Sequence, residues 1–195
     1  MIDAPTLGVR LMFSLVFTRR YSMAHRLIAD PDSKCAVPHG HNELVTVRLR
    51  PATPRRLDGD ANMVAAFEVA KRRWHRWIDE KVDHAFQLSN RDPLIDYFRN
   101  HEPAKLRRLL VTPGDPTTEM LAACFMAKLN AFLEEDGSEL RCVEVMVEET
   151  PTNTVTFSGD PSDVLPEGFA AGNRAHWWWR SDDSINDLEW NAEAS

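Results

Sequence analysis

The sequence predicts one α+β domain, an antiparallel four-stranded sheet with two helices on one face. Strands are expected where apolar and polar side chains alternate with a period of two, in residues 10–25, 39–50, 141–150 and 155–157. Helices are expected where apolar side chains recur every three or four positions, in residues 62–82 and 116–135. The predicted order is therefore strand, strand, helix, helix, strand, strand (ββααββ).

The first two strands should form a hairpin. One face of the first strand carries Leu11, Phe13, Leu15 and Phe17, and the same parity continues to His25. Residues 26–38, which include Asp30-Pro31-Asp32-Ser33, have the composition of a loop. In the second strand His39 and His41 share a face with Val45, Val47 and Leu49. Antiparallel pairing of the two strands would bring His25 beside His39 and His41.

The two helices have recognisable ends. The first should stop near Asp83-His84, and residues 85–115 read as irregular, with a short helix at 94–100 and breaks at Pro93, Pro103 and Pro113. The second should begin at Asp115-Pro116-Thr117-Thr118-Glu119, which offers a capping acid, a proline in the first position and an acid in the first turn. Asp136-Gly137 should end it.

The last two strands follow this helix, and a tail of different composition follows them. Glu149 continues the apolar face of Val143, Val145 and Val147, and residues 151–153 form a turn. Residues 159–195 are rich in Asp, Pro and Gly but hold four of the six tryptophans, including Trp177-Trp178-Trp179. We interpret the Trp run as packing rather than a ligand platform, with residues 1–158 as the domain and 159–195 as an extension on the body or in a subunit interface.

Composition narrows the class of protein. The net charge of −7 argues against nucleic-acid binding, which needs a basic face. No apolar run approaches the length of a membrane span, and the N-terminus lacks the pattern of a signal peptide. Three cysteines build no disulfide framework, which favours a reducing cytoplasm.

Three histidines form the clearest functional pattern: His25, His39 and His41, with Cys35 four residues before His39. An isolated H-x-H pair is more often a surface or core pair. Three neutral imidazoles on one face, however, leave a fourth coordination position open, which is typical of a catalytic zinc site. The complete set therefore predicts a zinc centre.

Short motifs in one order resemble the 6-pyruvoyl-tetrahydropterin synthase family. They are Ala24-His25-Arg26-Leu27, Lys34-Cys35, His39-Gly40-His41-Asn42, Asp83-His84, Pro116-Thr117-Thr118-Glu119 and Glu148-Glu149-Thr150. The resemblance implies a tunnelling fold (T-fold), zinc on the three histidines, and a homo-oligomer, a trimer or hexamer, with active sites between subunits. It implies a lyase whose small-molecule substrate is 7,8-dihydroneopterin triphosphate.

The resemblance also implies a role for each remaining motif residue. Cys35 matches the base, Asp83 and His84 the proton relay, and Glu149 the carboxylate that anchors the pterin, while Thr117, Thr118 and Glu119 line the pocket. Each has a plain structural alternative. Cys35 would be a small buried side chain, Asp83-His84 a helix cap, and Glu149 a surface acid at a strand end.

The spacing from Cys35 to His39 resembles that of the 6-carboxytetrahydropterin synthases. Such an enzyme releases triphosphate and acetaldehyde and forms 6-carboxytetrahydropterin, on the route to queuosine and other deazapurines. The alternatives are a 6-pyruvoyl-type elimination of triphosphate, or a zinc- and pterin-binding protein without turnover. The chain departs from the family at Glu43, where an aromatic is usual, and in a longer stretch at 91–115.

Overall fold

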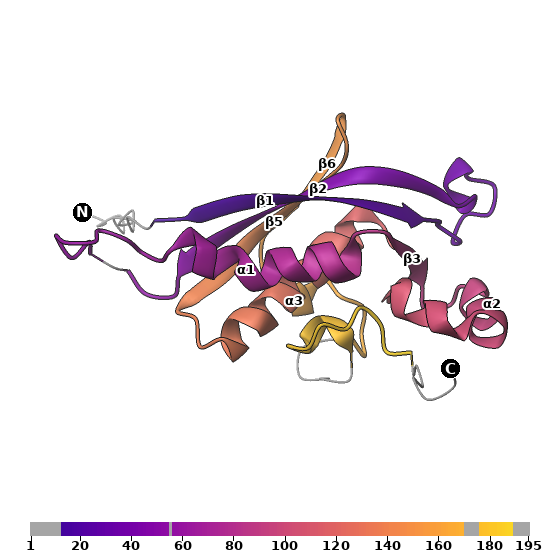
Figure 1. Ribbon diagram of the computed structural model, residues 1–195. Coiled ribbons are helices and arrows are strands. Elements are labelled where there is room, and N and C mark those ends of the chain that lie inside the picture. Colours follow the sequence, from indigo (N-terminus) through magenta and orange to yellow (C-terminus); the bar gives the residue numbers. More distant parts are fainter. Residues whose placement is uncertain (1–12, 55, 170–175, 189–195) are drawn as a thin grey trace, which may run out of the picture.

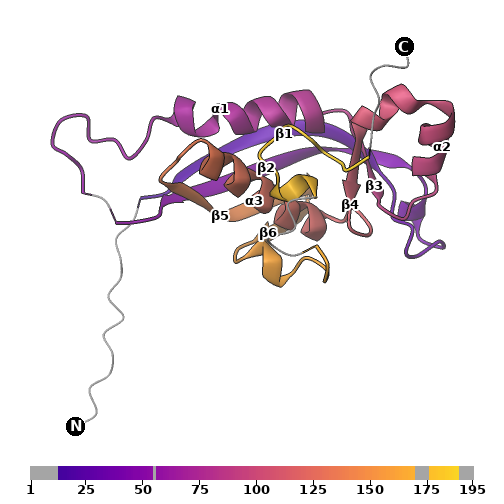
Figure 2. The ribbon, with the colours of Figure 1, turned by 90° about the horizontal axis from the view of Figure 1, so that it is seen from below.

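The computed structural model describes residues 13–54, 56–169 and 176–188; Leu11 and Trp190 lie outside them. Six strands form one mixed sheet in the order β4-β3-β1-β2-β5-β6 (Figures 1 and 2). Its strands are β1 Leu15–His25, β2 His39–Pro51, β3 Ala85–Ser89, β4 Leu109–Thr112, β5 Leu140–Thr150 and β6 Asn153–Phe157. Its helices are α1 Phe67–Trp77, α2 Leu94–His101 and α3 Thr118–Glu135, and a π-helical turn, Ile78–Val82, continues α1.

The four predicted strands are confirmed as neighbours, β1-β2-β5-β6, with each pair antiparallel. The prediction of a four-stranded sheet was wrong, because β3 and β4 extend it in parallel beyond β1. Both strands are short and almost wholly buried. A short buried strand shows no alternation of apolar and polar side chains, so its sequence resembles an irregular apolar run.

Helices α1 and α3 lie on the same face of the sheet, as predicted, and α2 lies beside β3 and β4 at the sheet edge (Figures 1 and 2). Helix α1 begins at Phe67, later than expected, and Ala66 gives it no side-chain cap. Thr117, and not Asp115, caps α3, because its side chain accepts a hydrogen bond from the backbone N–H of Met120. Gly137 follows the helix with φ +63°, as expected of a C-terminal glycine.

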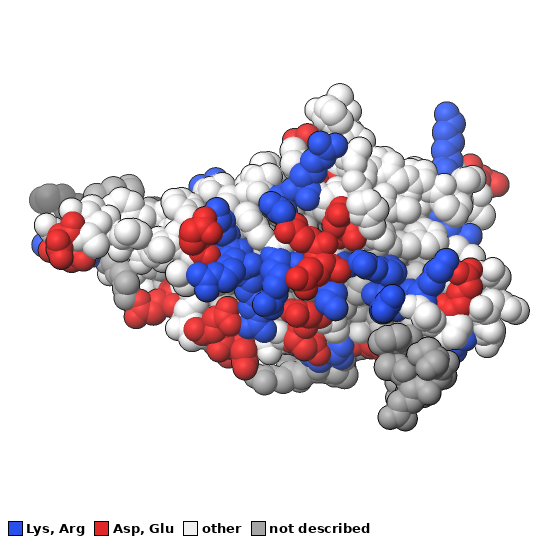
Figure 3. Space-filling view, viewed as in Figure 1, with Lys and Arg blue, Asp and Glu red and all other residues white. Residues whose placement is uncertain are grey.

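The face of the molecule over α1 carries interleaved charges of both signs (Figure 3). Lys71 pairs with Glu68, and Arg19 pairs with Asp79. Arg73 reaches Asp136 across to the end of α3. The cations on this face are thus largely neutralised by adjacent acids. In the described ranges no helix combines the length and apolar character needed to cross a membrane.

The described part of the tail packs on α3. Trp177 and Trp178 are buried. The centre of the Trp177 ring lies 6.1 Å from the centre of the Trp77 ring on α1. The indole N–H of Trp177 donates to the carbonyl of Val111 in β4, at 2.6 Å. Trp177 therefore joins the tail to both α1 and β4. The division of the chain at residue 158 stays a prediction.

Replacing Trp177 with Ala is expected to lower the free energy of unfolding by about 3–5 kcal/mol, since it empties a fully buried site between three elements. Urea unfolding followed by circular dichroism measures the loss. The matched control is Trp179→Ala, because Trp179 is only partly buried and should cost less. An equal loss in both variants, or none in Trp177→Ala, would contradict this account of the tail.

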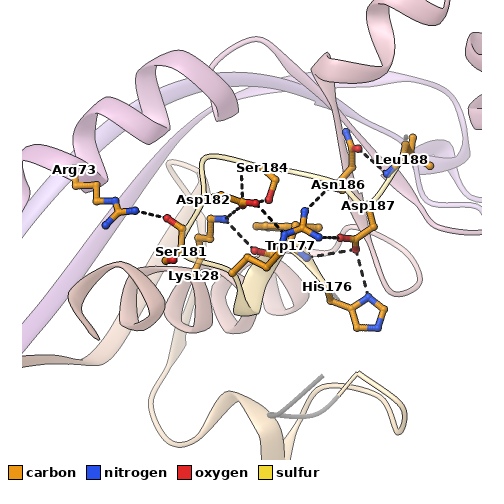
Figure 4. A network of polar contacts seen from close by, with 11 residues as sticks. Arg73, Lys128, His176, Trp177, Ser181, Asp182, Ser184, Asn186, Asp187 and Leu188 are labelled. Atoms are coloured by element: carbon orange, nitrogen blue, oxygen red, sulfur yellow. Dashed lines mark hydrogen bonds and ion pairs between the residues drawn. The ribbon is translucent and has the colours of Figure 1, made fainter. Parts of the chain in front are cut away.

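Lys128 of α3 lies fully buried under the tail. Its ammonium donates to the carbonyl of Trp177 at 3.0 Å and lies 3.4 Å from the carboxylate of Asp182 (Figure 4). The ammonium also lies 5.2 Å from the centre of the Phe132 ring. Burial lowers the pKa of Lys128 to about 8, against the opposing effect of Asp182.

This lowered pKa predicts a pH dependence of stability. An unfolded lysine has a pKa near 10.4, so between about pH 8 and 10 the unfolded chain binds more protons at Lys128 than the folded one. Lys128 should therefore make the folded state more stable as the pH rises through this range. Lys128→Met should lack this rise. Unfolding free energies of both proteins at pH 7 and 9.5 test it; a difference between them that is independent of pH would be the contrary result.

Candidate functional site

The three histidines meet on the helix-covered face of the sheet. In the predicted hairpin, which the structure confirms, His25 of β1 lies opposite His39 of β2, and Met23 lies opposite His41. The ring nitrogens of the three histidines lie within 4.8 Å of one another. His25 is buried, while His39 and His41 are half-buried. The pairing of β1 with β2 therefore brings His39 and His41 into one cluster with His25, although they follow it by 14 and 16 positions in the sequence.

Hydrogen bonds orient two of these imidazoles toward a shared centre. Nδ1 of His25 donates to the carbonyl of Pro116 at 3.2 Å, and Nδ1 of His39 donates to that of Val37 at 2.8 Å. Both Nε2 atoms then carry lone pairs, and they face each other at 3.1 Å. Two imidazole nitrogens on one tetrahedral metal ion stand about 3.3 Å apart. Burial lowers the pKa of His25, which favours the neutral ring that a metal ion needs. The cluster thus fits a metal ion held by backbone-oriented histidines.

A cavity of about 550 Å³ opens beside His25. Its walls come from the loop after β1, the first turn of α3, the end of β5 and the start of β6. Predicted site residues in these walls are His25, Cys35, Thr117, Thr118, Glu119 and Glu149. Three segments far apart in the sequence therefore place the predicted catalytic thiol, the predicted anchoring carboxylate and one predicted metal ligand in one space.

Local hydrogen bonds position the cavity residues. The backbone N–H of Leu27 donates to the carbonyl of Cys35 at 2.8 Å, which ties the short helix Lys34–Ala36 back to the end of β1. Cys35 is half-buried. On the facing wall, the hydroxyl of Thr118 donates to Glu149 at 3.3 Å. The start of α3 therefore orients the carboxylate that is expected to hold the substrate.

Asp83 and His84 contact each other but lie outside this cavity. Nδ1 of His84 donates to the Asp83 carboxylate at 2.8 Å, and the other Asp83 oxygen accepts from the backbone N–H of Ser22 at 2.7 Å. The pKa of Asp83 is lowered: burial acts to raise it, but the hydrogen bonds from Ser22 and His84 outweigh this. The His84 side chain is 76% exposed. The structure thus forms the predicted acid–imidazole pair without bringing it to the cavity of the same subunit.

A buried pair below the histidines was missed as part of the site. Tyr21 lies opposite Glu43, and its hydroxyl donates to one Glu43 oxygen, while the other oxygen has no hydrogen-bond partner among the described residues. Leu44 pairs with Glu148, so Glu43 and Glu149 are the next positions along β2 and β5. Burial raises the pKa of Glu43 to about 7; Glu149 adds to the rise, and the Tyr21 bond opposes it. In the sequence, Glu43 shares a strand face with the apolar Val45, Val47 and Leu49, and this acid in an apolar row could have marked it as part of the site.

Two further acids hold the loop that follows His25. Asp115, expected to cap α3, instead accepts hydrogen bonds from the backbone N–H groups of Ile28 and Ala29. The buried carboxylate of Asp92 binds the guanidinium of Arg26 through both oxygens. The guanidinium of Arg26 is therefore already paired inside the protein.

Comparison with known proteins agrees with this arrangement. The sequence profile described as 6-pyruvoyl tetrahydropterin synthase matches residues 14–160. A protein of Halobacterium salinarum named probable 6-carboxy-5,6,7,8-tetrahydropterin synthase is 33% identical over 135 residues, which are 69% of this chain and 79% of that protein.

Solved structures share the fold. An uncharacterized protein of Wolinella succinogenes aligns with a TM-score of 0.62 at 20% identity, over 77% of this chain and 99% of its own. The 6-pyruvoyl tetrahydropterin synthase of Caenorhabditis elegans aligns with a TM-score of 0.52 at 24% identity, over 77% and 97%. On the family match and the Halobacterium relative, the chain belongs to the 6-pyruvoyl tetrahydropterin synthase family.

Proposed function

We propose that this protein is a zinc-dependent 6-carboxytetrahydropterin synthase. It converts 7,8-dihydroneopterin triphosphate and one water molecule to 6-carboxytetrahydropterin, triphosphate and acetaldehyde. The observation that carries the proposal is the cavity that joins His25, Cys35 and Glu149. The four-residue spacing from Cys35 to His39 and the name of the Halobacterium relative support the 6-carboxy product.

His25, His39 and His41 would hold the zinc ion, which when bound supplies Lewis-acid polarisation of the substrate's side-chain hydroxyls. Glu149 accepts two N–H bonds from the edge of the pterin ring, as a carboxylate does from a guanidinium. The Thr118 hydroxyl keeps that carboxylate in place. Cys35, across the cavity, removes a proton from the carbon side chain of the bound substrate.

Asp83 and His84 are proposed to complete the site of a neighbouring subunit. Their exposure and their position outside the cavity support this role, since a proton relay needs to reach the substrate. The assembly would be a trimer or a hexamer with active sites at subunit boundaries. Mixing inactive Cys35→Ala chains with inactive His84→Ala chains should restore part of the activity if the two residues act from different subunits. If re-formed mixed oligomers recovered no activity, the proposal that Asp83 and His84 act in a neighbouring subunit's site would be contradicted.

Mass spectrometry of the products tests the reaction itself. Zinc-loaded protein incubated with 7,8-dihydroneopterin triphosphate should yield 6-carboxytetrahydropterin and acetaldehyde. Glu149→Gln is the matched control, because it keeps the shape of the side chain but removes the charge that binds the pterin edge. Formation of 6-pyruvoyltetrahydropterin would assign the sister activity. No turnover by the zinc-loaded oligomer would refute the proposal.

A further inference from the structure

A second cavity, of about 480 Å³, lies between α2, the ends of β3 and β4, and the tail. It shares no lining residue with the cavity beside His25. Its walls come from residues 90–99 and 111–113, in or next to the 91–115 stretch. The tail contributes Phe169, His176, Trp178, Asp187 and Leu188. The tail residues of this lining lie beyond residues 14–160, which match the family model, so one side of the cavity is built outside the matched domain.

One wall of this cavity is aromatic. The rings of His176 and Trp178 stack with their centres 4.9 Å apart and their planes 7° apart. Phe169 leans against both, with ring centres 4.7 Å from His176 and 5.8 Å from Trp178. Trp178 is buried, whereas His176 and Phe169 are half-buried and keep ring surface at the cavity. Such a wall favours the stacking of a flat ring.

The acids around the cavity are already bound. Asp92 holds Arg26, and Asp96 holds Arg99. Asp187 accepts hydrogen bonds from Nδ1 of His176 and from the backbone N–H of Trp177, and it pairs with Arg180 (Figure 4). The Asp187 contacts hold the His176 side of the aromatic wall, and the three ion pairs neutralise carboxylates that would otherwise repel an anion.

Among the described residues that line the cavity, Arg91 is the cation whose side chain forms no ion pair. It is exposed at the start of the α2 segment, and its guanidinium has no hydrogen-bond or ion-pair partner within the described ranges. A guanidinium in this position can bind a phosphate or carboxylate through two N–H groups. A single unpaired guanidinium can neutralise one anionic group, but not the several charges of a chain of phosphates.

We propose that this cavity binds a flat heteroaromatic ring that carries one anionic group, of the size of a purine nucleoside monophosphate. The ring lies on Phe169 and His176, with the buried Trp178 packed against both, and the anionic group lies at Arg91. The volume falls within the range of about 300–1,000 Å³ that small-molecule sites occupy. The site is separate from the proposed catalytic cavity and does not depend on its function.

Isothermal titration of the zinc-loaded protein with AMP and GMP tests the proposal. Adenosine and ribose 5-phosphate separate the ring from the anion, and each should bind more weakly than AMP. Arg91→Ala should weaken AMP about tenfold, the effect of losing one charge-assisted hydrogen-bond pair, and leave adenosine unchanged. Arg72→Ala, which removes an exposed cation on α1, is the matched control and should bind AMP like the wild type.

A second variant separates this site from the catalytic one. Glu149→Gln should bind AMP with unchanged affinity, whether or not the protein turns over a pterin. Loss of AMP binding in Glu149→Gln would place the nucleotide in the catalytic cavity and overturn the proposal. So would the absence of AMP and GMP binding by the wild type, or equal AMP affinities in Arg91→Ala and the wild type.

Discussion

Replacing His39 with Ala is expected to lower the affinity for zinc by more than about 100-fold and to abolish turnover. Loss of a hydrogen-bond partner of a metal ligand already costs about 10–100-fold, and His39→Ala removes a ligand itself. His39 is the suitable target because it is half-buried at the start of β2, whereas His25 is buried and bonded to Pro116. Metal analysis of purified protein and zinc titration measure the effect.

His101→Ala is the matched control for this experiment. His101 ends α2 and is exposed, and its ring lies on Tyr97 rather than in the histidine cluster. This variant should retain the full zinc content and activity of the wild type. Full zinc occupancy in His39→Ala would refute the assignment of the metal ligands, whatever the activity of the variant.

Replacing Cys35 with Ala is expected to reduce kcat by about 10²–10⁴-fold, the usual contribution of a general base. Zinc content and unfolding free energy should change little, because the half-buried side chain lies in a short surface helix and the contacts that hold this segment are made by its backbone. Steady-state kinetics with 7,8-dihydroneopterin triphosphate, together with metal analysis, would separate the loss of the base from the loss of the metal.

Cys142→Ala provides the comparison for Cys35→Ala. Cys142 is buried in β5, and burial raises the pKa of its thiol to about 12, so it stays protonated and takes no part in proton transfer near neutral pH. This variant should keep the wild-type kcat. If Cys35→Ala also kept it, the base would have to be sought among the other cavity residues.

Much of the site followed from local patterns. The alternation along β1 and β2 placed His25, His39 and His41 on one face, because side chains two apart in a strand point the same way. Cys35 lies in the loop between these strands, so the hairpin also brings it to the cavity beside His25. Thr118 and Glu149 required more, since their contact joins the start of α3 to the end of β5 across 31 residues. Only the resemblance to a family suggested that these two segments share a pocket.

The sequence by itself determined the hairpin, the two long helices and the histidine cluster, because each rests on a repeat or spacing within a short stretch. The tertiary structure decided which donors the carboxylates of Asp115 and Glu43 bind. Asp115 had the position of a helix cap, yet it binds the loop after β1; Glu43 had the position of a core residue, yet it receives the Tyr21 hydroxyl. A carboxylate that is wholly or partly removed from water must find donors wherever packing brings them, and those donors lie 22 and 87 residues away in the chain.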